Sequence, residues 1–171
     1  QAQNGARARR LPYVRLLDAA GGSVKTFEQI GRTYIPTNPS TPGIQDMLCE
    51  VPVVSAALGS VAGLPAVDAC LSHFNLMVKG ISQVFPGGPP VVKASLGIDI
   101  SKEDLGDERS QVYESGVIDN LVETEEEAFE LADALKKQLE HQRVPESDHE
   151  SLRLMFAGLV VTADRSCSWC S

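Results

Sequence analysis

Aromatic side chains are scarce in this 171-residue chain, at 5% of its residues. So few rings offer little surface on which unpaired bases could stack, which argues against a binder of single-stranded nucleic acid. Long apolar runs are also missing, because the run MFAGLVV over 155–161 is far too short to span a bilayer. The opening QAQNGARARR lacks an initiating Met and has no apolar segment behind its arginines, so we expect no signal peptide. We therefore expect neither nucleic acid nor a membrane among the partners.

The familiar catalytic motifs are missing too. The sequence contains no G-x-x-x-x-G-K-[ST] phosphate loop, no G-x-G-x-x-G behind a strand and no G-x-S-x-G nucleophile elbow. The three histidines do not have the spacing of metal ligands, so no metal is predicted. His73 opens an expected strand, where a structural role is commoner than a catalytic one. The acids of 124–130 are explained as charges at a helix start.

Composition predicts one ordinary globular domain, with 43% hydrophobic and 22% charged residues. The net charge of −8 is concentrated in residues 99–150, where 17 acids face 5 bases, which disfavours a polyanion groove in that half. Cys49 and Cys70 lie among apolar residues and are expected to be reduced core residues. The lone CSWC at 167–170 is a weak zinc or redox signal without a second pair of ligands.

Strands that alternate with helices predict an α/β fold. The apolar runs 11–17, 51–58 and 74–78 are expected strands, with two short extended pieces in 80–97 and 115–121. Helices are expected over 24–35, 44–50, 65–72, 101–106 and 124–140, with another beginning at Pro89 and an irregular loop over 36–43. Ser101 with Asp104, and Thr124 with Glu127, form capping boxes.

Two of the expected strands end in glycine turns. Gly21 and Gly22 follow 11–17, whereas Gly59 and Gly63 follow 51–58. If these strands are neighbours, backbone N–H groups of both turns can point at one position. Such donors could hold the negative oxygen of an enolate formed from a thioester, aided by a helix that begins at Pro65. Two ordinary tight turns are the commoner explanation of this pattern.

Three motifs in order resemble the biotin-dependent acyl-CoA carboxyltransferase family, the β subunits of propionyl-, methylcrotonyl- and acetyl-CoA carboxylases. The family reads G-P-C-A-G-G-A, then F-x-x-G-P-P-x-V-K-x-x-x-G-E, then D-L-G-G. The first motif is matched by Gly59, Ala62 and Gly63, and the third by Asp104, Leu105 and Gly106. The second is matched by Phe85, Gly88, Pro89, Pro90, Val92, Lys93 and Gly97. The resemblance covers residues 11–140.

The resemblance implies a crotonase-like (ClpP/crotonase) ββα spiral, here incomplete. Residues 11–140 would be part of an N-terminal carboxyltransferase domain, after a helix end or disordered arm over 1–10 and before a divergent tail over 141–171. It implies that the backbone amides of Gly21, Gly22, Gly63 and Leu64 stabilise the oxyanion. It also implies a substrate-binding set of Gly59, Ala62, Phe85, Gly87, Gly88 and Pro89.

The implied reaction moves a carboxyl group from carboxybiotin to the α carbon of an acyl-CoA. Carboxybiotin would release CO₂, the biotin ureido anion would take the α-proton, and the enolate would attack CO₂. The implied partners are a biotin carboxyl carrier, a biotin carboxylase subunit and further copies of the chain, in the cytoplasm or the mitochondrial matrix. Biotin would be carried on a partner domain, and the coenzyme A thioester would be the substrate.

The chain departs from the family pattern in several places. Leu64 replaces the second glycine of A-G-G, and Asp107 follows Gly106 where the family has glycine. The biotin-facing domain has no counterpart here, so we expect at most half of an active site. Two alternatives stay open: a non-catalytic remnant that keeps a crotonase-like core, and a subunit of a biotin-dependent CoA-ester decarboxylase.

Overall fold

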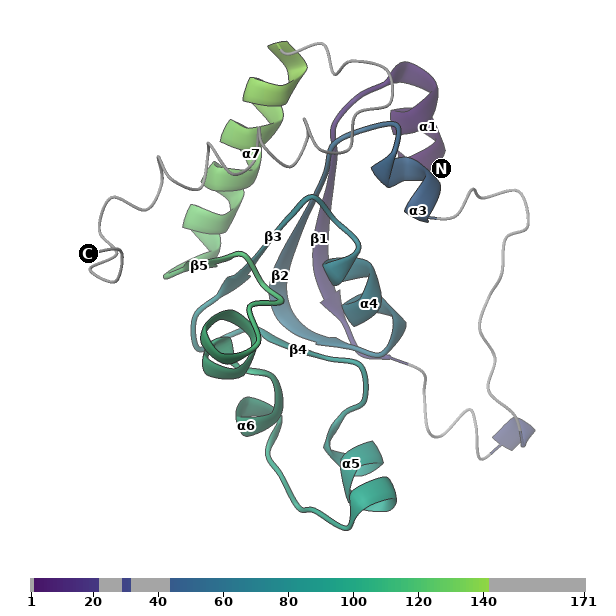
Figure 1. Cartoon of the computed structure of the whole chain (residues 1–171), viewed down its shortest axis with the longest axis vertical. Coiled ribbons are helices and arrows are strands. Elements are labelled where there is room, and N and C mark those ends of the chain that lie inside the picture. Colours follow the sequence, from purple (N-terminus) through teal and green to yellow (C-terminus); the bar gives the residue numbers. More distant parts are fainter. Residues whose placement is uncertain (1, 22–28, 32–43, 142–171) are drawn as a thin grey trace.

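The computed structural model describes residues 2–21, 29–31 and 44–141 (Figure 1). For residues 44, 45 and 138–141 this description is limited to the backbone. Gly22, the expected loop over 36–43, most of the expected helix over 24–35 and the tail beyond 141 lie outside these residues.

A parallel sheet with helices on both faces forms the centre of the molecule (Figure 1). The strands are β1 (Tyr13–Ala19), β2 (Val53–Ala62), β3 (Phe74–Val78), β4 (Gln83–Phe85) and β5 (Asn120–Val122). Their order is β1-β2-β3-β5, and β4 pairs with β2 outside this path. The helices are α1 (Ala2–Arg9), α3 (Ile44–Leu48), α4 (Leu64–Cys70), α5 (Pro89–Leu96), α6 (Lys102–Gly106), the π-helix η1 (Arg109–Glu114) and α7 (Glu125–His141). The predicted α/β class is confirmed.

Strand β2 changes its neighbour along its length. Residues 54–57 pair with β3, whereas residues 60–62 pair with β4. The sequence predicted that the strand ends at Leu58, and this is wrong, because β4 supplies backbone partners that continue it to Ala62. Gly59 lies at the change, and a Cβ atom added there would lie 2.5 Å from Oδ1 of Asp18. We call this change of neighbour at Gly59 the bend of β2. The pairing of β1 with β2 also shifts in register near the bend, between Leu17 and Ala19.

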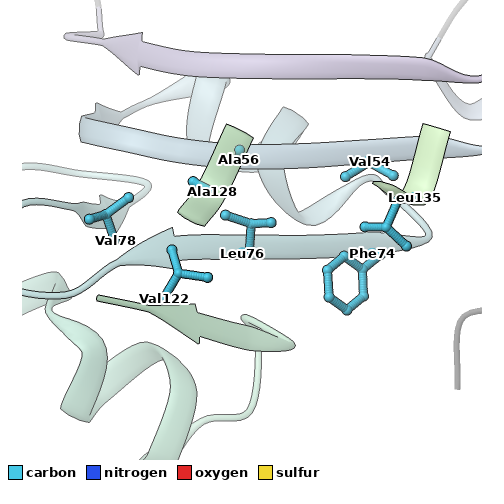
Figure 2. Close-up of a cluster of buried hydrophobic side chains, with 8 residues drawn as sticks. All are labelled: Val54, Ala56, Phe74, Leu76, Val78, Val122, Ala128 and Leu135. Atoms are coloured by element: carbon cyan, nitrogen blue, oxygen red, sulfur yellow. The ribbon is translucent and has the colours of Figure 1, made fainter. Parts of the chain in front are cut away.

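Helix α7 covers one face of the sheet (Figure 1). Alternate residues of each strand point to this face because side chains along a strand alternate in direction. Figure 2 shows the resulting cluster of Val54, Ala56, Phe74, Leu76, Val78, Val122, Ala128 and Leu135. The helical stripe predicted in 124–140 thus supplies Ala128 and Leu135 to the core.

The start of α7 is fixed by the predicted capping residues. The Glu127 N–H donates to Oγ1 of Thr124 at 3.2 Å, and Oε2 of Glu127 accepts from the Glu123 N–H at 2.8 Å. The carboxylate therefore reaches one residue beyond the cap residue, and both bonds satisfy N–H groups near the helix start.

The opposite face, under α4, carries two apolar clusters with polar residues between them. One cluster joins the start of the sheet to α1 and α3, and includes Ala6, Met47, Val51 and Val53. The other joins its end to α4, and includes Ala57, Val61, Ala66, Met77, Val84 and Ile118. The register aligns Arg15 of β1, Ser55 of β2 and Asn75 of β3, and all three are buried. We call these three residues the polar row.

Asn75 at one end of the polar row is hydrogen-bonded through its backbone N–H and through both the oxygen and the nitrogen of its side-chain amide. Its backbone N–H donates to Oδ2 of Asp119 at 2.8 Å, and its Oδ1 accepts from the Asp119 N–H at 2.7 Å. Its Nδ2 donates to the Val117 carbonyl at 3.1 Å. These bonds tie the segment before β5 to β3.

Helix α6 packs closely on β4. Its predicted cap is present, since the Asp104 N–H donates to Oγ of Ser101 at 3.0 Å. At its other end Gly106 is buried, and a Cβ atom there would lie 2.6 Å from Cδ1 of Phe85 and 2.7 Å from the Val84 carbonyl oxygen. Only a residue without a side chain fits between α6 and β4.

We expect Gly106→Ala to lower the free energy of unfolding by about 2 kcal/mol, because the methyl group has no space against the backbone of β4. Urea unfolding followed by circular dichroism measures this change. Gly5→Ala is the matched control, since nothing lies within 4 Å of the added methyl in α1, and alanine favours a helix. Equal stabilities of the two variants would contradict the close packing of α6 on β4.

Candidate functional site

The two predicted glycine turns lie in contact at one edge of the sheet. Because β1 and β2 run parallel, both turns leave the sheet on the same side, with Ala19 in register with Val61. A Cβ atom on Gly21 would lie 3.1 Å from the Ala62 carbonyl oxygen, and one on Gly63 would lie 3.3 Å from Cα of Gly21. The backbones therefore touch without intervening side chains.

The N–H groups at this contact are not equivalent. The Gly63 N–H donates to the Phe85 carbonyl at 3.1 Å, so it is already used in holding β4. Leu64 is the first residue of α4, where an N–H has no acceptor within its own helix. Within the described ranges, neither the Leu64 N–H nor the Gly21 N–H has a hydrogen-bond acceptor. Of the four predicted donors, these two remain for a ligand, and Gly22 lies outside the described residues.

Gly63 adopts a conformation that a side chain would strain. Its φ is 72° and its ψ is −136°, a region that glycine alone occupies readily. Helix α4 turns away from β2 at this point, with Pro65 in its first turn. The side chains of Leu64 and Val67 are 56% and 44% exposed, so apolar surface lies beside the glycine contact.

A further glycine loop, formed by Gly87 and Gly88, is linked through Phe85 to the turn that contains Gly63. Phe85 was predicted to contact substrate, but its side chain is only 5% exposed. Its ring lies under Gly88, where a Cβ atom would be 3.5 Å from Cε2, and against Gly106. Its carbonyl receives the Gly63 N–H, so Phe85 anchors the loop rather than presenting its ring. Gly87, Gly88 and Pro89 lie at the start of α5, with Gly88 as its cap residue.

Polar groups gather beside the bend of β2, and the sequence did not indicate them. Oγ of Ser60 donates to Oε1 of the buried Gln83 at 2.5 Å, and Nζ of Lys102 donates to Oγ of Ser60 at 3.4 Å. Gly59 faces the Asp18 carboxylate on the adjacent strand. These side chains are far apart in the sequence, and they are brought together by strand pairing and by the packing of α6 on β4.

His73 has the structural role that was predicted. Its Nδ1 accepts from the Val53 N–H at 3.0 Å, and its Nε2 lies 3.0 Å from the Leu48 carbonyl. An accepting Nδ1 leaves the proton on Nε2, so the ring bridges α3 and β2 as a neutral imidazole.

Cys49 and Cys70 are free thiols, as predicted, but they are exposed rather than part of the core. Partial burial and the Asp119 charge raise the pKa of the Cys70 thiol, which keeps it protonated and weakly nucleophilic at neutral pH. In the described part of the chain, no three His, Cys, Asp or Glu side chains cluster as metal ligands would. None of the helices in the described ranges has the length and apolarity needed to cross a bilayer.

Comparison with known proteins gives a family match and several relatives. The family model described as the carboxyl transferase domain matches residues 2–155. The probable mitochondrial methylcrotonoyl-CoA carboxylase beta chain of Drosophila melanogaster is 31% identical over 140 residues, 77% of this chain and 23% of that protein. The methylmalonyl-CoA decarboxylase subunit alpha of Veillonella parvula is 35% identical over 122 residues, 69% of this chain and 23% of that protein. This chain therefore spans about a quarter of the length of these relatives.

A solved structure shares the fold. Transcarboxylase 12S, in a structure described as a hexamer assembly with hydrolysed methylmalonyl-coenzyme A bound, has a TM-score of 0.61 and 22% identity. The superposition covers 86% of this chain and 28% of that one. At this identity the likeness concerns the fold, and it confirms the predicted crotonase-like class.

We expect Gly63→Ala to destabilise the chain by about 2–3 kcal/mol, since it combines a strained backbone with a methyl group pressed against Gly21. Gly97→Ala is the matched control, because Gly97 also has a φ of 72° but lies in open space. Thermal or urea unfolding of both variants measures the difference. If Gly97→Ala were as damaging as Gly63→Ala, the contact between the two turns would not contribute to stability.

Proposed function

Since the chain belongs to the carboxyl transferase domain family, we propose that it binds an acyl-CoA thioester where the two glycine turns meet. This site would serve the transfer of a carboxyl group from carboxybiotin to the α carbon of the acyl-CoA. One observation carries the proposal: Gly21 packs directly on Ala62 and Gly63, so the Gly21 and Leu64 N–H groups, which have no acceptor among the described residues, belong to backbones in contact.

The chemistry needs donors at the thioester oxygen. Removal of the α-proton places negative charge on this oxygen, and fixed N–H groups stabilise the charge without having to reorient. Backbone amides suit this role because strand pairing holds them in position. The Gly63 N–H is bonded to Phe85, so we assign the role to Gly21 and Leu64. Gly63 acts indirectly, by letting the chain turn sharply into α4.

Carboxybiotin, carried on a partner domain, supplies the carboxyl group. The part of the reaction that we assign to this chain is on the acyl-CoA side. Gly59, Ala62, Gly87, Gly88 and Pro89 are assigned to substrate binding on the family resemblance. We assign a structural role to Phe85, whose ring is buried.

The direction of carboxyl transfer is open to a second candidate. The Veillonella parvula relative is named as a decarboxylase subunit, and its 35% identity exceeds that of the carboxylase beta chain. A decarboxylase would use the same oxyanion donors, because loss of the carboxyl group from an acyl-CoA also produces an enolate. The proposed binding site is therefore common to both activities.

We further propose that the chain works as a homo-oligomer together with a biotin carboxyl carrier and a biotin carboxylase subunit. The related transcarboxylase 12S is described as a hexamer. In this chain α5 buries none of its residues, and Val91, Leu96 and Ile98 are more than half exposed in and just after it. Apolar surface of this kind commonly marks a protein interface. The naming of the Drosophila relative as mitochondrial supports the mitochondrial matrix as one location, with the cytoplasm as the other.

The Leu64 amide can be tested by replacing Leu64 with proline, which removes the N–H but fits the first position of a helix. We expect Leu64→Pro to raise the dissociation constant for propionyl-CoA about three- to tenfold, the value of one hydrogen bond. Leu64→Ala is the matched control, because it removes the side chain and keeps the N–H. Isothermal titration calorimetry with propionyl-CoA and with free coenzyme A measures both.

Free coenzyme A lacks the thioester oxygen, so its affinity should be the same in wild type and Leu64→Pro. Equal losses for both ligands would contradict a role of the amide at the carbonyl. If the wild-type chain is folded, as judged by circular dichroism, but binds neither ligand, the result would instead support the hypothesis of a non-catalytic remnant.

A further inference from the structure

Only some of the polar groups in the row of Arg15, Ser55 and Asn75 have hydrogen-bond partners among the described residues. The Asn75 amide has partners for its oxygen and its nitrogen. Arg15 is 8% exposed and donates from Nη2 to the Leu71 carbonyl at the end of α4. Among the described residues, its buried Nε and Nη1 have no hydrogen-bond partner, and neither does Oγ of Ser55, which is 1% exposed.

These unpartnered groups lie on adjacent strands. Arg15 and Ser55 are register partners in β1 and β2, and side chains of paired residues lie on the same face of a sheet. Apolar clusters lie before and after the row along the strands. Buried polar groups in native proteins are almost always hydrogen-bonded, to protein atoms or to ordered water.

We propose that the row contains a binding site for an internal water molecule between the Arg15 guanidinium and Ser55. The water accepts a hydrogen bond from a guanidinium nitrogen and forms a second hydrogen bond with the Ser55 hydroxyl. A serine hydroxyl can donate or accept, so it matches either orientation of the water. Internal waters of this kind typically join two to four polar groups that the fold leaves without partners.

The charges near the row favour a neutral molecule over an anion. Burial lowers the pKa of the Arg15 guanidinium, and the negative charge of Asp68 on α4 opposes this effect. Asp119 places a second carboxylate at the Asn75 end of the row. An anion entering this space would face both acids, whereas water adds no charge.

The sign of one substitution tests the proposal. If water bridges the two side chains, Ser55→Ala removes a hydrogen bond and raises the unfolding equilibrium constant roughly fivefold. If Ser55 has no partner at all, Ser55→Ala removes an unsatisfied hydroxyl and leaves stability unchanged or higher. Urea unfolding of the whole chain distinguishes these outcomes. The stability of Ser55→Thr, which keeps the hydroxyl, should be closer to that of the wild type than the stability of Ser55→Val, because valine is isosteric with threonine but has no hydroxyl.

A double-mutant cycle shows whether the effect passes through Arg15. In an Arg15→Met background the water loses the guanidinium donors, so Ser55→Ala should no longer destabilise. If that variant does not fold, Arg15→Leu replaces it, because leucine also lacks a hydrogen-bond donor. A nuclear Overhauser effect between water and the Ser55 amide should disappear in Ser55→Ala/Arg15→Met. Additive effects of the two substitutions would overturn the proposal. The proposal would also be overturned if the free energy of unfolding rose when chloride replaced acetate at constant ionic strength, because such a rise would indicate a bound anion in place of water.

Discussion

The parallel pairing of β1 with β2 is the interaction on which the proposed site depends. It carries both glycine turns to the same edge, and the slip between Leu17 and Ala19 lets Gly21 reach the level of Ala62 and Gly63. The bend of β2 at Gly59 is part of the same arrangement, because it allows β4 to pair with Ser60, Val61 and Ala62. β4 then holds Gly63 through the Phe85 carbonyl. Three strands thus fix a contact that contains almost no side-chain atoms.

The two ends of the strands are built differently. Where β2 and β3 begin, side chains bind backbone groups: His73 accepts from the Val53 N–H, and Asn75 and Asp119 bind each other's backbone N–H groups. Where β1 and β2 end, glycines let the backbones touch. Polar side chains therefore stabilise the starts of the strands, while the space at their ends is left open around backbone N–H donors. This division suits a site that acts through its backbone, because its precision has to come from the fold.

The sequence predicted those features that local pattern determines. The run 74–78 became β3 without change, and Thr124 and Ser101 cap the helices they were expected to cap. Gly59 was misleading, because a glycine in an apolar run resembles a turn until a second strand is seen to pair beyond it. The apolar neighbours of Cys49 and Cys70 did not reveal that both residues are exposed. The burial of Phe85 depends on α6, and a motif does not state which side of a ring is covered. The burial of Arg15 was not predicted, because the Leu71 carbonyl that it binds comes from a distant segment.

The order of strands along the chain has a consequence for how the site forms. β2, β3 and β4 follow one another closely, whereas β1 reaches β2 across residues 20–52. Closing a longer loop costs more entropy, so we expect β1 to join a sheet that its neighbours have already formed. The meeting of Gly21 with Gly63 is then among the last events of folding. A ligand bound by both turns would stabilise the product of that late step, and so it would make dissociation of β1 from the sheet less favourable.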